Sequence, residues 1–460
     1  MSTSVAVTML ADPTIQIAVA CILVSLFLVM RSVQKSKDEE TVYPVIAGMA
    51  IGNPQYRCTQ DQALVVASKC PGVESVKPVL ERIYGNSRIS SRYFAVPDFT
   101  PSQAAKGDPM FFPADGSYEV PVDVRLDKFK EKAVPLVSDV ARRAIKEAGL
   151  DVSDISKLVV VSSTGFLGPG LDCELIKNLG LTRSVDRTLI GFMGCAAAMN
   201  GFRNANDYVS ANPGKYALMI CVELSSVHTT FEDNINDAIL HAIFADGCAA
   251  AVLKGARKSE CPKGTLAIVD NHAWLMEGTE DGITLAIKPN GITCTLSKFL
   301  PQYIAKNIAF FADGFLKKNN LARDDVDFWC VHPGGRRIIE EAQNGLGLTE
   351  EQTADSWAVL GEYGNMLSPS VMFVLSRVFK RHNAALAQGK RGYQTGMAFS
   401  FSPGVAPWLE QWNGSLGGSG GRQLQKSSPK LLVFHIRYCY PEQVSTHREY
   451  CRVHPRLSGT

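Results

Sequence analysis

The chain has little net charge and lacks the cysteine patterns of disulfide-rich or metal-binding proteins. Its 460 residues include 47 basic and 45 acidic side chains, so no face is basic enough to indicate nucleic-acid binding. The 12 cysteines include no CxxC pair, and no cluster of His and Cys has the spacing of metal ligands. Most cysteines lie in apolar runs such as "ALMICVEL", which is typical of reduced thiols in the cytosol. These absences favour small-molecule partners.

Apolar runs and helical patterns alternate along the middle of the chain, as they do in α/β proteins. Hydrophobic residues make up 46% of the sequence, enough for two domain-sized units. A helical pattern followed by a strand occurs at 134–164 and again at 307–333, and short matches link the two regions at nearly one offset. We therefore expect a duplicated α/β unit, with a chance match as the alternative. The matches are Leu150 with Leu321, Asp154 with Asp325, Ile155 with Val326, and "GFMGC" (191–195) with "GEYGN" (361–365).

Both ends of the chain differ from this pattern. Residues 15–30 form an apolar run followed by the basic stretch "RSVQKSK", with no small-residue cleavage site before it. This favours a signal anchor whose basic flank keeps the body of the protein in the cytoplasm. The run is shorter than the roughly 20 residues of a usual span, so a signal peptide or a gene-model error is the alternative. At the other end, a Gly- and Ser-rich stretch after Trp412 is typical of a linker, and we expect residues 413–460 to be irregular.

A cysteine stands in the glycine-flanked turn "GFMGCAAAMNG" at 191–201. The run before it predicts a strand and the small residues after it predict a helix, so Cys195 stands at or beside a helix N-terminus. The N–H groups and the helix dipole there stabilise a thiolate. Cys195 is therefore the candidate nucleophile, whereas Cys221, Cys248 and Cys330 are expected to be buried structural cysteines.

A thiolate nucleophile needs a base or a cationic neighbour, and His332 is the best candidate among the eight histidines. It ends the apolar strand "DFWCV" and opens the turn "PGG" before a helical pattern, at the level where strands end. Asn365 in "GNMLSPS" precedes a helix that begins with Ser-Pro. A lone Asn in a turn is usually only a turn residue, but the repeat places Asn365 opposite Cys195.

Together, Cys195, "HPGG" and "GN" resemble the type III polyketide synthases, the chalcone synthase-like branch of the thiolase superfamily. The resemblance implies a five-layered αβαβα thiolase-like α/β fold built from two duplicated halves, with a helix of each half buried between the sheets. It also implies a homodimer with "GFLGPG" near the partner. The implied regions are an anchor and flank (1–40), a half with the nucleophile (41–255), a half with His and Asn (256–412) and a linker and tail (413–460). The motifs are "VIAGMAIGNP", "SSTGFLGPGLD", "GFMGC", "CVELSS", "IFADGCAAAVL", "HPGGRRIIEEA", "GEYGNMLSPSVMFVL" and "FSFSPG".

By matching motifs, the resemblance implies that Cys195 accepts the acyl group and that His332 and Asn365 bind the thioester carbonyl. A Cys195 thiolate paired with an imidazolium would attack an acyl-CoA, and malonyl-CoA would then lose CO₂ to give an enolate that attacks the bound acyl group. CoA thioesters are the substrates, and the resemblance implies no metal and no other cofactor. The implied substrate-binding residues are Phe244 as a gatekeeper, Cys294, Ser163, His228, Leu285 and Leu367 around the acyl and elongation cavities, and Arg82 and Arg336 for CoA phosphates.

Departures from the plant enzymes bear on the product. Cys294 replaces a second gatekeeper phenylalanine and should open room for an aliphatic starter, whereas bulk at His228, Leu285 and Leu367 should stop extension early. We therefore expect alkyl α-pyrones, with alkylresorcinols or resorcylic acids as rival products.

Three other functions differ from this pattern. A ketoacyl synthase of fatty-acid initiation would be expected to show "HQAN" where "HPGG" stands. A papain-like protease would carry a Cys-Gly-Ser-Cys-Trp signature, which this sequence lacks. A catalytically silent acyl-binding protein would have lost one of the three residues, and all three are present.

Overall fold

The structure is a computed structural model that describes residues 13–40, 42–70, 73–100, 110–111, 120–230, 232, 234–257, 260–261, 264–276, 278–403 and 430–438. Nine strands build the main sheet: β1 (Val42–Gly52), β4 (Ile155–Ser162), β5 (Asp186–Gly191), β6 (Tyr216–Leu224), β7 (Asp246–Arg257), β8 (Leu266–Leu275), β11 (Phe328–Val331), β12 (Thr395–Phe401) and β13 (Lys430–Tyr438). Their order in space is β11-β12-β13-β8-β1-β7-β6-β4-β5.

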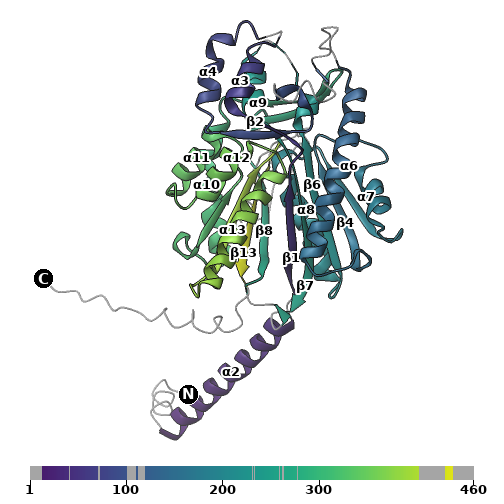
Figure 1. The fold of residues 1–460 in the computed structure, drawn as a ribbon. Helices are drawn as coiled ribbons and strands as arrows, with labels where there is room; N and C mark the ends of the chain where they lie inside the picture. The colour runs from purple at the N-terminus through teal and green to yellow at the C-terminus, as the bar shows by residue number, and fades with distance from the viewer. Residues whose placement is uncertain are drawn as a thin grey trace, which may run out of the picture.

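Helices cover the outside of the sheet and also fill the space between its two halves (Figure 1). The outer helices are α6 (Val122–Glu147) and α7 (Leu171–Leu179) on one half, and α10 (Leu300–Lys318) and α11 (Arg336–Leu346) on the other. The inner ones are α8 (Ala197–Ala211) and α13 (Pro369–Ala387), and α12 (Ala354–Tyr363) leads into α13.

Alternating side chains of the strands create these layers. Leu158 and Val160 of β4 pack with residues of α6 and α7, while Val159 and Val161 point to the inner cluster that contains α8 and α13. A strand that is buried on both faces is apolar throughout, as "LVVV" of β4 is. The cluster around α10 and α11 covers Trp329 of β11. The predicted αβαβα fold, with one helix of each half buried between the sheets, is confirmed.

The two halves repeat the same local pattern at equivalent places. A 3₁₀ turn at Val152–Asp154 leads into β4, and another at Arg323–Asp325 leads towards β11. Cys195 lies just before α8, and Asn365 lies just before α13. The duplication therefore brings the turns before the two inner helices to one end of the molecule.

A group of shorter elements covers that end. It lies at the top of Figure 1, where α3, α4, α9 and β2 are labelled. The elements are β2 (Tyr56–Thr59), α3 (Gln60–Ala67), α4 (Lys77–Gly85), β3 (Ser91–Phe94), α9 (Ile235–Ile243), β9 (Ile283–Lys288) and β10 (Gly291–Leu296).

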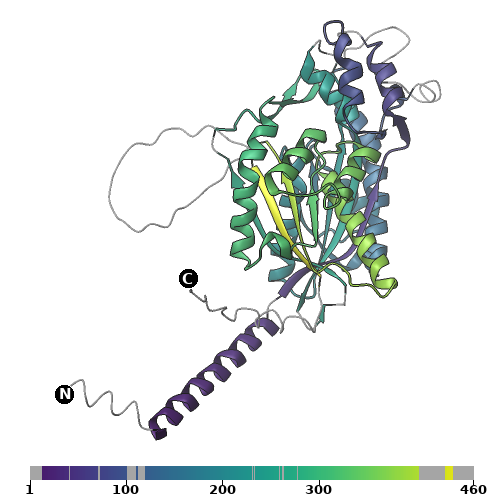
Figure 2. The same ribbon diagram turned by 90° about the vertical axis from the view of Figure 1, so that its left-hand side faces the viewer.

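The predicted anchor at residues 15–30 lies in helix α2 (Pro13–Glu40), which extends away from the body at the opposite end (Figure 2). Its large apolar side chains, among them Ile22, Phe27 and Met30, are exposed. Of the helices in the described ranges, none has the length and apolar content needed to cross a membrane. The structure thus does not support the predicted spanning anchor, and attachment of this segment to a lipid surface stays a prediction of the sequence.

Strand β13 corrects the expectation of an irregular tail for residues 430–438, and the rest of 413–460 lies outside the described residues. Its main chain pairs antiparallel with β12 from Thr395 opposite Arg437 to Phe401 opposite Leu431, and with β8 on its other side. The strand occupies a central position, where both of its edges are hydrogen-bonded. The apolar run "KLLVFHIRY" therefore completes the sheet, although it follows a linker-like stretch.

Ending the chain after residue 412 is expected to lower the melting temperature by about 10 °C or more, because the facing edges of β12 and β8 would lose their partner. Scanning fluorimetry with gel filtration measures this. A chain that ends at residue 440 is the matched control and should melt like the full chain. Equal melting temperatures for all three chains would contradict a structural role of β13.

Candidate active site

Cys195 lies in a tight turn between β5 and α8. It occupies the 3₁₀ turn Gly194–Ala196, directly before the first residue of α8. Gly194 has φ of +60°, and a Cβ at this position would lie 2.5 Å from Cδ of Pro403, so only glycine fits. The Cys195 side chain is 9% exposed. The predicted placement of this thiol beside a helix N-terminus is confirmed.

Hydrogen bonds from other segments hold this turn. The main-chain N–H of Gly194 donates to Ser163 Oγ (2.9 Å), and Ser400 Oγ donates to the carbonyl of Cys195 (2.9 Å). The N–H of Ser163 donates in turn to the buried carboxylate of Glu223, which also accepts from the Ser368 hydroxyl at 2.7 Å. Ser163 thus supports the turn that carries the nucleophile. From the sequence, this residue is predicted only as a substrate contact.

His332 follows the last residue of β11, as the sequence predicts. Its main-chain N–H donates to the carbonyl of Phe399 (2.9 Å), which fixes the residue at the strand end. The side chain is 1% exposed, and neither ring nitrogen has a hydrogen-bond partner. Buried polar groups without partners are rare in proteins and call for an explanation, and an imidazole that waits for a substrate atom provides one.

Asn365 follows Gly364, which has φ of +69°. The Asn365 side chain donates from Nδ2 to the carbonyl of Gly334 (3.1 Å) and accepts from the N–H of Leu367 (2.9 Å). The Asn365 amide also lies near enough to the Cys195 thiol to act against the rise of the thiol pKa that burial causes. The amide is therefore oriented by the turn that follows His332 and lies beside the nucleophile.

A cavity of about 650 Å³ brings these three side chains together. Cys195, His332 and Asn365 all line it, although they come from three separate turns. Ligand cavities of this size accept molecules much larger than a metal ion, and no group of three or more metal-binding side chains occurs in the described part of the chain. The predicted residues that also line this cavity are Phe244, Leu285, Cys294, Leu367 and Arg336.

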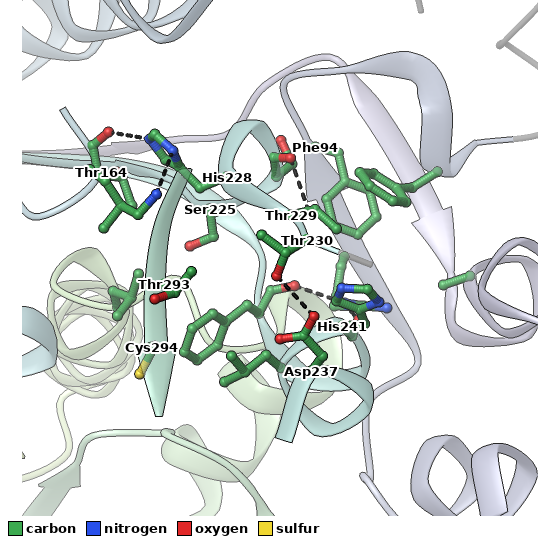
Figure 3. Close-up of a pocket in the computed structure, with 18 of the residues that line it drawn as sticks. Phe94, Thr164, Ser225, His228, Thr229, Thr230, Asp237, His241, Thr293 and Cys294 are labelled. Carbon is green, nitrogen blue, oxygen red and sulfur yellow. Dashed lines mark hydrogen bonds between the residues drawn. The ribbon is translucent and has the colours of Figure 1, made fainter. Parts of the chain in front are cut away.

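A second, smaller cavity of about 80 Å³ adjoins the larger one, and Figure 3 draws side chains that line it. Phe244, Leu285, Cys294 and Leu367 line both cavities, so they form the partition between them. Hydroxyl groups and a carboxylate surround the inner space; Thr230 Oγ1, for example, donates to Asp237 at 2.9 Å.

His228 is locked in the wall of this inner cavity. The N–H of Ile292 donates to its Nδ1 (3.2 Å), so the ring proton is on Nε2, which lies 2.7 Å from the carbonyl of Thr164. Burial lowers the pKa of His228 to about 4. His228 lines a cavity, as predicted from the sequence. Its two hydrogen bonds fix the orientation of a neutral ring in the cavity wall.

Basic side chains gather at the mouth of the larger cavity. Lys298, Arg336 and Arg337 line it, and both arginines pair with glutamates one turn further along α11. Arg82 lies exposed on α4 and does not line the cavity, whereas Ile83 of the same helix and Asn86, the residue after its end, do. Sequence reasoning missed Lys298, whose only signal is its place four residues after Cys294.

Burial suppresses charge on the reacting groups of the empty site. It raises the pKa of the Cys195 thiol well above its usual value, helped by nearby Cys294 and Glu223, and it lowers the pKa of His332 to about 3. Burial therefore favours a neutral thiol and a neutral imidazole before substrate binds. The thiolate and imidazolium pair expected from the sequence stays a prediction, which the pH dependence of Cys195 alkylation tests.

Comparison with known families gives a consistent result over nearly the whole body. The profile described as "Chalcone and stilbene synthases, N-terminal domain" matches residues 33–257, and the C-terminal domain of the same family matches residues 268–408.

Individual proteins are similar as well. The Mycobacterium tuberculosis protein named "Alpha-pyrone synthesis polyketide synthase-like Pks18" is 39% identical over 368 residues, which cover 79% of this chain and 90% of that protein. Polyketide synthase 37 of Dictyostelium discoideum is 37% identical over 331 residues, 72% of this chain but only 11% of that much longer protein.

Solved structures agree with the fold. The crystal structure of PKS-I from the brown alga Ectocarpus siliculosus is 87% identical with a TM-score of 0.80, and the match covers 87% of this chain and all of that one. The C-terminal type III polyketide synthase domain of Steely1, a type I/III hybrid from Dictyostelium, is 24% identical with a TM-score of 0.72 over 86% of this chain. The latter match supports the fold alone.

Iodoacetamide is expected to alkylate Cys195 about tenfold faster for each pH unit between about pH 6 and pH 8, because the thiolate fraction rises in that proportion below the raised thiol pKa. Mass spectrometry of the peptide that contains Cys195 measures the rate. His332→Gln should leave the slope unchanged, since a neutral imidazole supplies no counter-charge. A rate that is flat over this range would show a preformed thiolate and imidazolium pair and contradict the neutral resting state.

Proposed function

The chain belongs to the chalcone and stilbene synthase family and is a type III polyketide synthase, and we propose that it joins an aliphatic acyl-CoA starter to malonyl-CoA units and releases alkyl α-pyrones. The family acts on acyl-CoA and malonyl-CoA and uses no other cofactor. The observation that supports the assignment of roles is the convergence of Cys195, His332 and Asn365 on one cavity.

Starter loading uses the thiol and the imidazole. As the Cys195 sulfur bonds to the thioester carbon, His332 accepts the thiol proton and returns it to the departing CoA sulfur. The two residues begin and end this step neutral, so the charge that burial disfavours exists only during the transfer. The amide of Asn365 donates to the oxygen on which charge develops.

Chain extension uses the same two donors. Malonyl-CoA loses CO₂, and the electron pair of the broken C–C bond forms an enolate whose oxygen accepts hydrogen bonds from His332 and Asn365. The enolate carbon then attacks the acyl carbon on Cys195, and the Cys195 sulfur leaves as the new C–C bond forms. The lengthened chain is now a CoA thioester, and Cys195 takes it back with release of CoA before the next extension. A buried site protects the enolate from protonation by water.

The partition between the two cavities supports a short product. Cys294 is smaller than a phenylalanine and leaves space beside Phe244 for an alkyl chain, whereas Leu285 and Leu367 fill the wall and His228 is fixed behind it. After two extensions the chain is a thioester of CoA; the enol oxygen at C5 attacks its thioester carbon, the CoA sulfur leaves and takes up the enol proton, and an α-pyrone is released. The Mycobacterium tuberculosis relative is named for α-pyrone synthesis, which supports this product over alkylresorcinols.

The cavity mouth supports binding of the CoA phosphates. Lys298, Arg336 and Arg337 supply the cations, and phosphates prefer such clusters.

An exposed sheet edge supports a homodimer. β5 ends the main sheet, and apolar Leu189 on it is 46% exposed. Phe166 of the "GFLGPG" loop is 61% exposed and contacts Phe192 edge to face. Pairing of two such edges would cover these side chains. Sedimentation equilibrium should give the mass of two chains, and the mass of one chain would contradict the homodimer.

Product analysis by mass spectrometry tests the proposed function. The full chain is incubated with malonyl-CoA and saturated acyl-CoA starters of two to eighteen carbons, with Cys195→Ala as the control. We expect α-pyrones of two extensions that disappear in the control. Resorcinols would contradict the proposed product, and single-step products or a requirement for acyl carrier protein would contradict the proposed reaction.

A further inference from the structure

Arg92 on β3 is a buried cation that the proposed reaction does not use. Its side chain is 2% exposed, and the groups that accept its hydrogen bonds are neutral. Nε donates to Oε1 of Gln60 (3.1 Å), and Nη1 donates to the carbonyls of His241 (2.5 Å) and Phe244 (2.7 Å). A buried guanidinium is costly unless its donors are satisfied. Two of the three acceptors of Arg92 are main-chain carbonyls of one short segment, residues 241–244.

That segment is the end of helix α9, where the gatekeeper lies. The last carbonyls of a helix lack partners within the helix, and a cation there also interacts favourably with the helix dipole. Arg92 binds the carbonyls of His241 and Phe244, and Gln60 Nε2 donates to the carbonyl of Ala242 between them (2.8 Å). The side chain of His241 lines the inner cavity (Figure 3). Arg92 and Gln60 together fix the direction in which the chain leaves α9 and hence the position of Phe244.

The stem of Arg92 packs against the residue before Asn365. A Cβ at Gly364 would lie 2.8 Å from both Cγ and Cδ of Arg92 and 2.9 Å from the carbonyl oxygen of Ile243. Glycine at this position therefore allows the arginine stem to lie directly on the main chain.

A main-chain bridge joins the same two segments. The N–H of Asn365 donates to the carbonyl of Ile243 (2.8 Å), and the N–H of Ala245 donates to the carbonyl of Asn365 (2.9 Å). Phe244 and Asn365 are thus bridge partners, and Arg92 contacts the main chain on both sides of the bridge.

We propose that Arg92 is a positioning residue that sets the gatekeeper Phe244 and the Asn365 amide relative to each other, and so controls both starter selection and enolate stabilisation. This rests on the proposed function. The planar fork of arginine reaches two carbonyls and Gln60 at fixed angles, whereas lysine offers a single flexible ammonium. Arg92→Lys therefore keeps the charge and loses the geometry.

The test compares Arg92→Lys with Arg125→Lys in the full chain. Arg125 is 1% exposed and donates from Nη1 to the carbonyls of Val227 and Thr229, so it is a matched buried arginine outside the bridge. Three readouts are taken: melting temperature, kcat for product formation, and the relative rates at which acyl-CoA starters of different length load Cys195, followed by intact-protein mass spectrometry.

Arg92→Lys is expected to lower kcat by about 10- to 100-fold, since small displacements of reacting groups have effects of this size, and to reduce the preference between short and long starters at least threefold. Arg125→Lys should lose comparable melting temperature yet keep the wild-type loading preference and kcat within about twofold. Gly364→Ala adds a methyl group that would clash with the Arg92 stem, so it should change the loading preference in the same way. This variant replaces Arg92→Lys in the test if Arg92→Lys does not fold.

The proposal is overturned if Arg92→Lys, or Gly364→Ala in its place, keeps the wild-type loading preference and loses activity only in proportion to stability. If the wild-type chain loads starters but makes no ketide product, the proposed function fails instead, and the loading preference still decides the role of Arg92.

Discussion

The two-residue bridge between Phe244 and Asn365 is the contact on which the site's geometry depends. Phe244 belongs to the first half of the chain and Asn365 to the second, and their main-chain hydrogen bonds hold the two halves together beside the nucleophile. A catalytic arrangement needs its members fixed to within a fraction of an ångström. Here the duplication supplies two equivalent turns, and the bridge fixes one against the other. Gly364 is required at this point because its φ of +69° and the close approach of Arg92 leave no space for a side chain.

Burial explains both the chemistry and the resting state of the site. Cys195, His332 and Asn365 are each at most 9% exposed, so neither a thiolate nor an imidazolium is favoured until a substrate arrives. The same exclusion of water strengthens the hydrogen bonds that His332 and Asn365 offer to a developing oxyanion. This arrangement lowers the stability of the fold, because both ring nitrogens of His332 are buried without a hydrogen-bond partner. A bound substrate then supplies the partner that the folded protein lacks.

Local sequence patterns were sufficient for the fold and the three central residues, but not for the details that depend on packing. Rules of strand and helix termini predict Cys195, His332 and Asn365 in turns at strand ends. The repeat predicts a duplicated α/β unit, and the resemblance to type III polyketide synthases implies its thiolase-like layers. The division of the interior into two cavities depends on how Phe244, Leu285, Cys294 and Leu367 meet, which no local pattern encodes. That Arg82 does not line the cavity also depends on the rotation of helix α4, which no local pattern encodes, and its role toward CoA phosphates stays a prediction. The strand β13 was missed because its partners β8 and β12 are distant in sequence and a glycine-rich stretch precedes it.

Acyl-enzyme trapping tests the central claim most directly, namely that Cys195 is the acyl acceptor of a site shared by both halves. The full chain is mixed with acyl-CoA in the absence of malonyl-CoA, and the acylated peptide is identified by mass spectrometry. We predict one acyl group per chain, on Cys195, with loading slowed strongly by His332→Gln. Acylation of another cysteine in the folded protein, or equal loading of a Cys195→Ala variant, would contradict it.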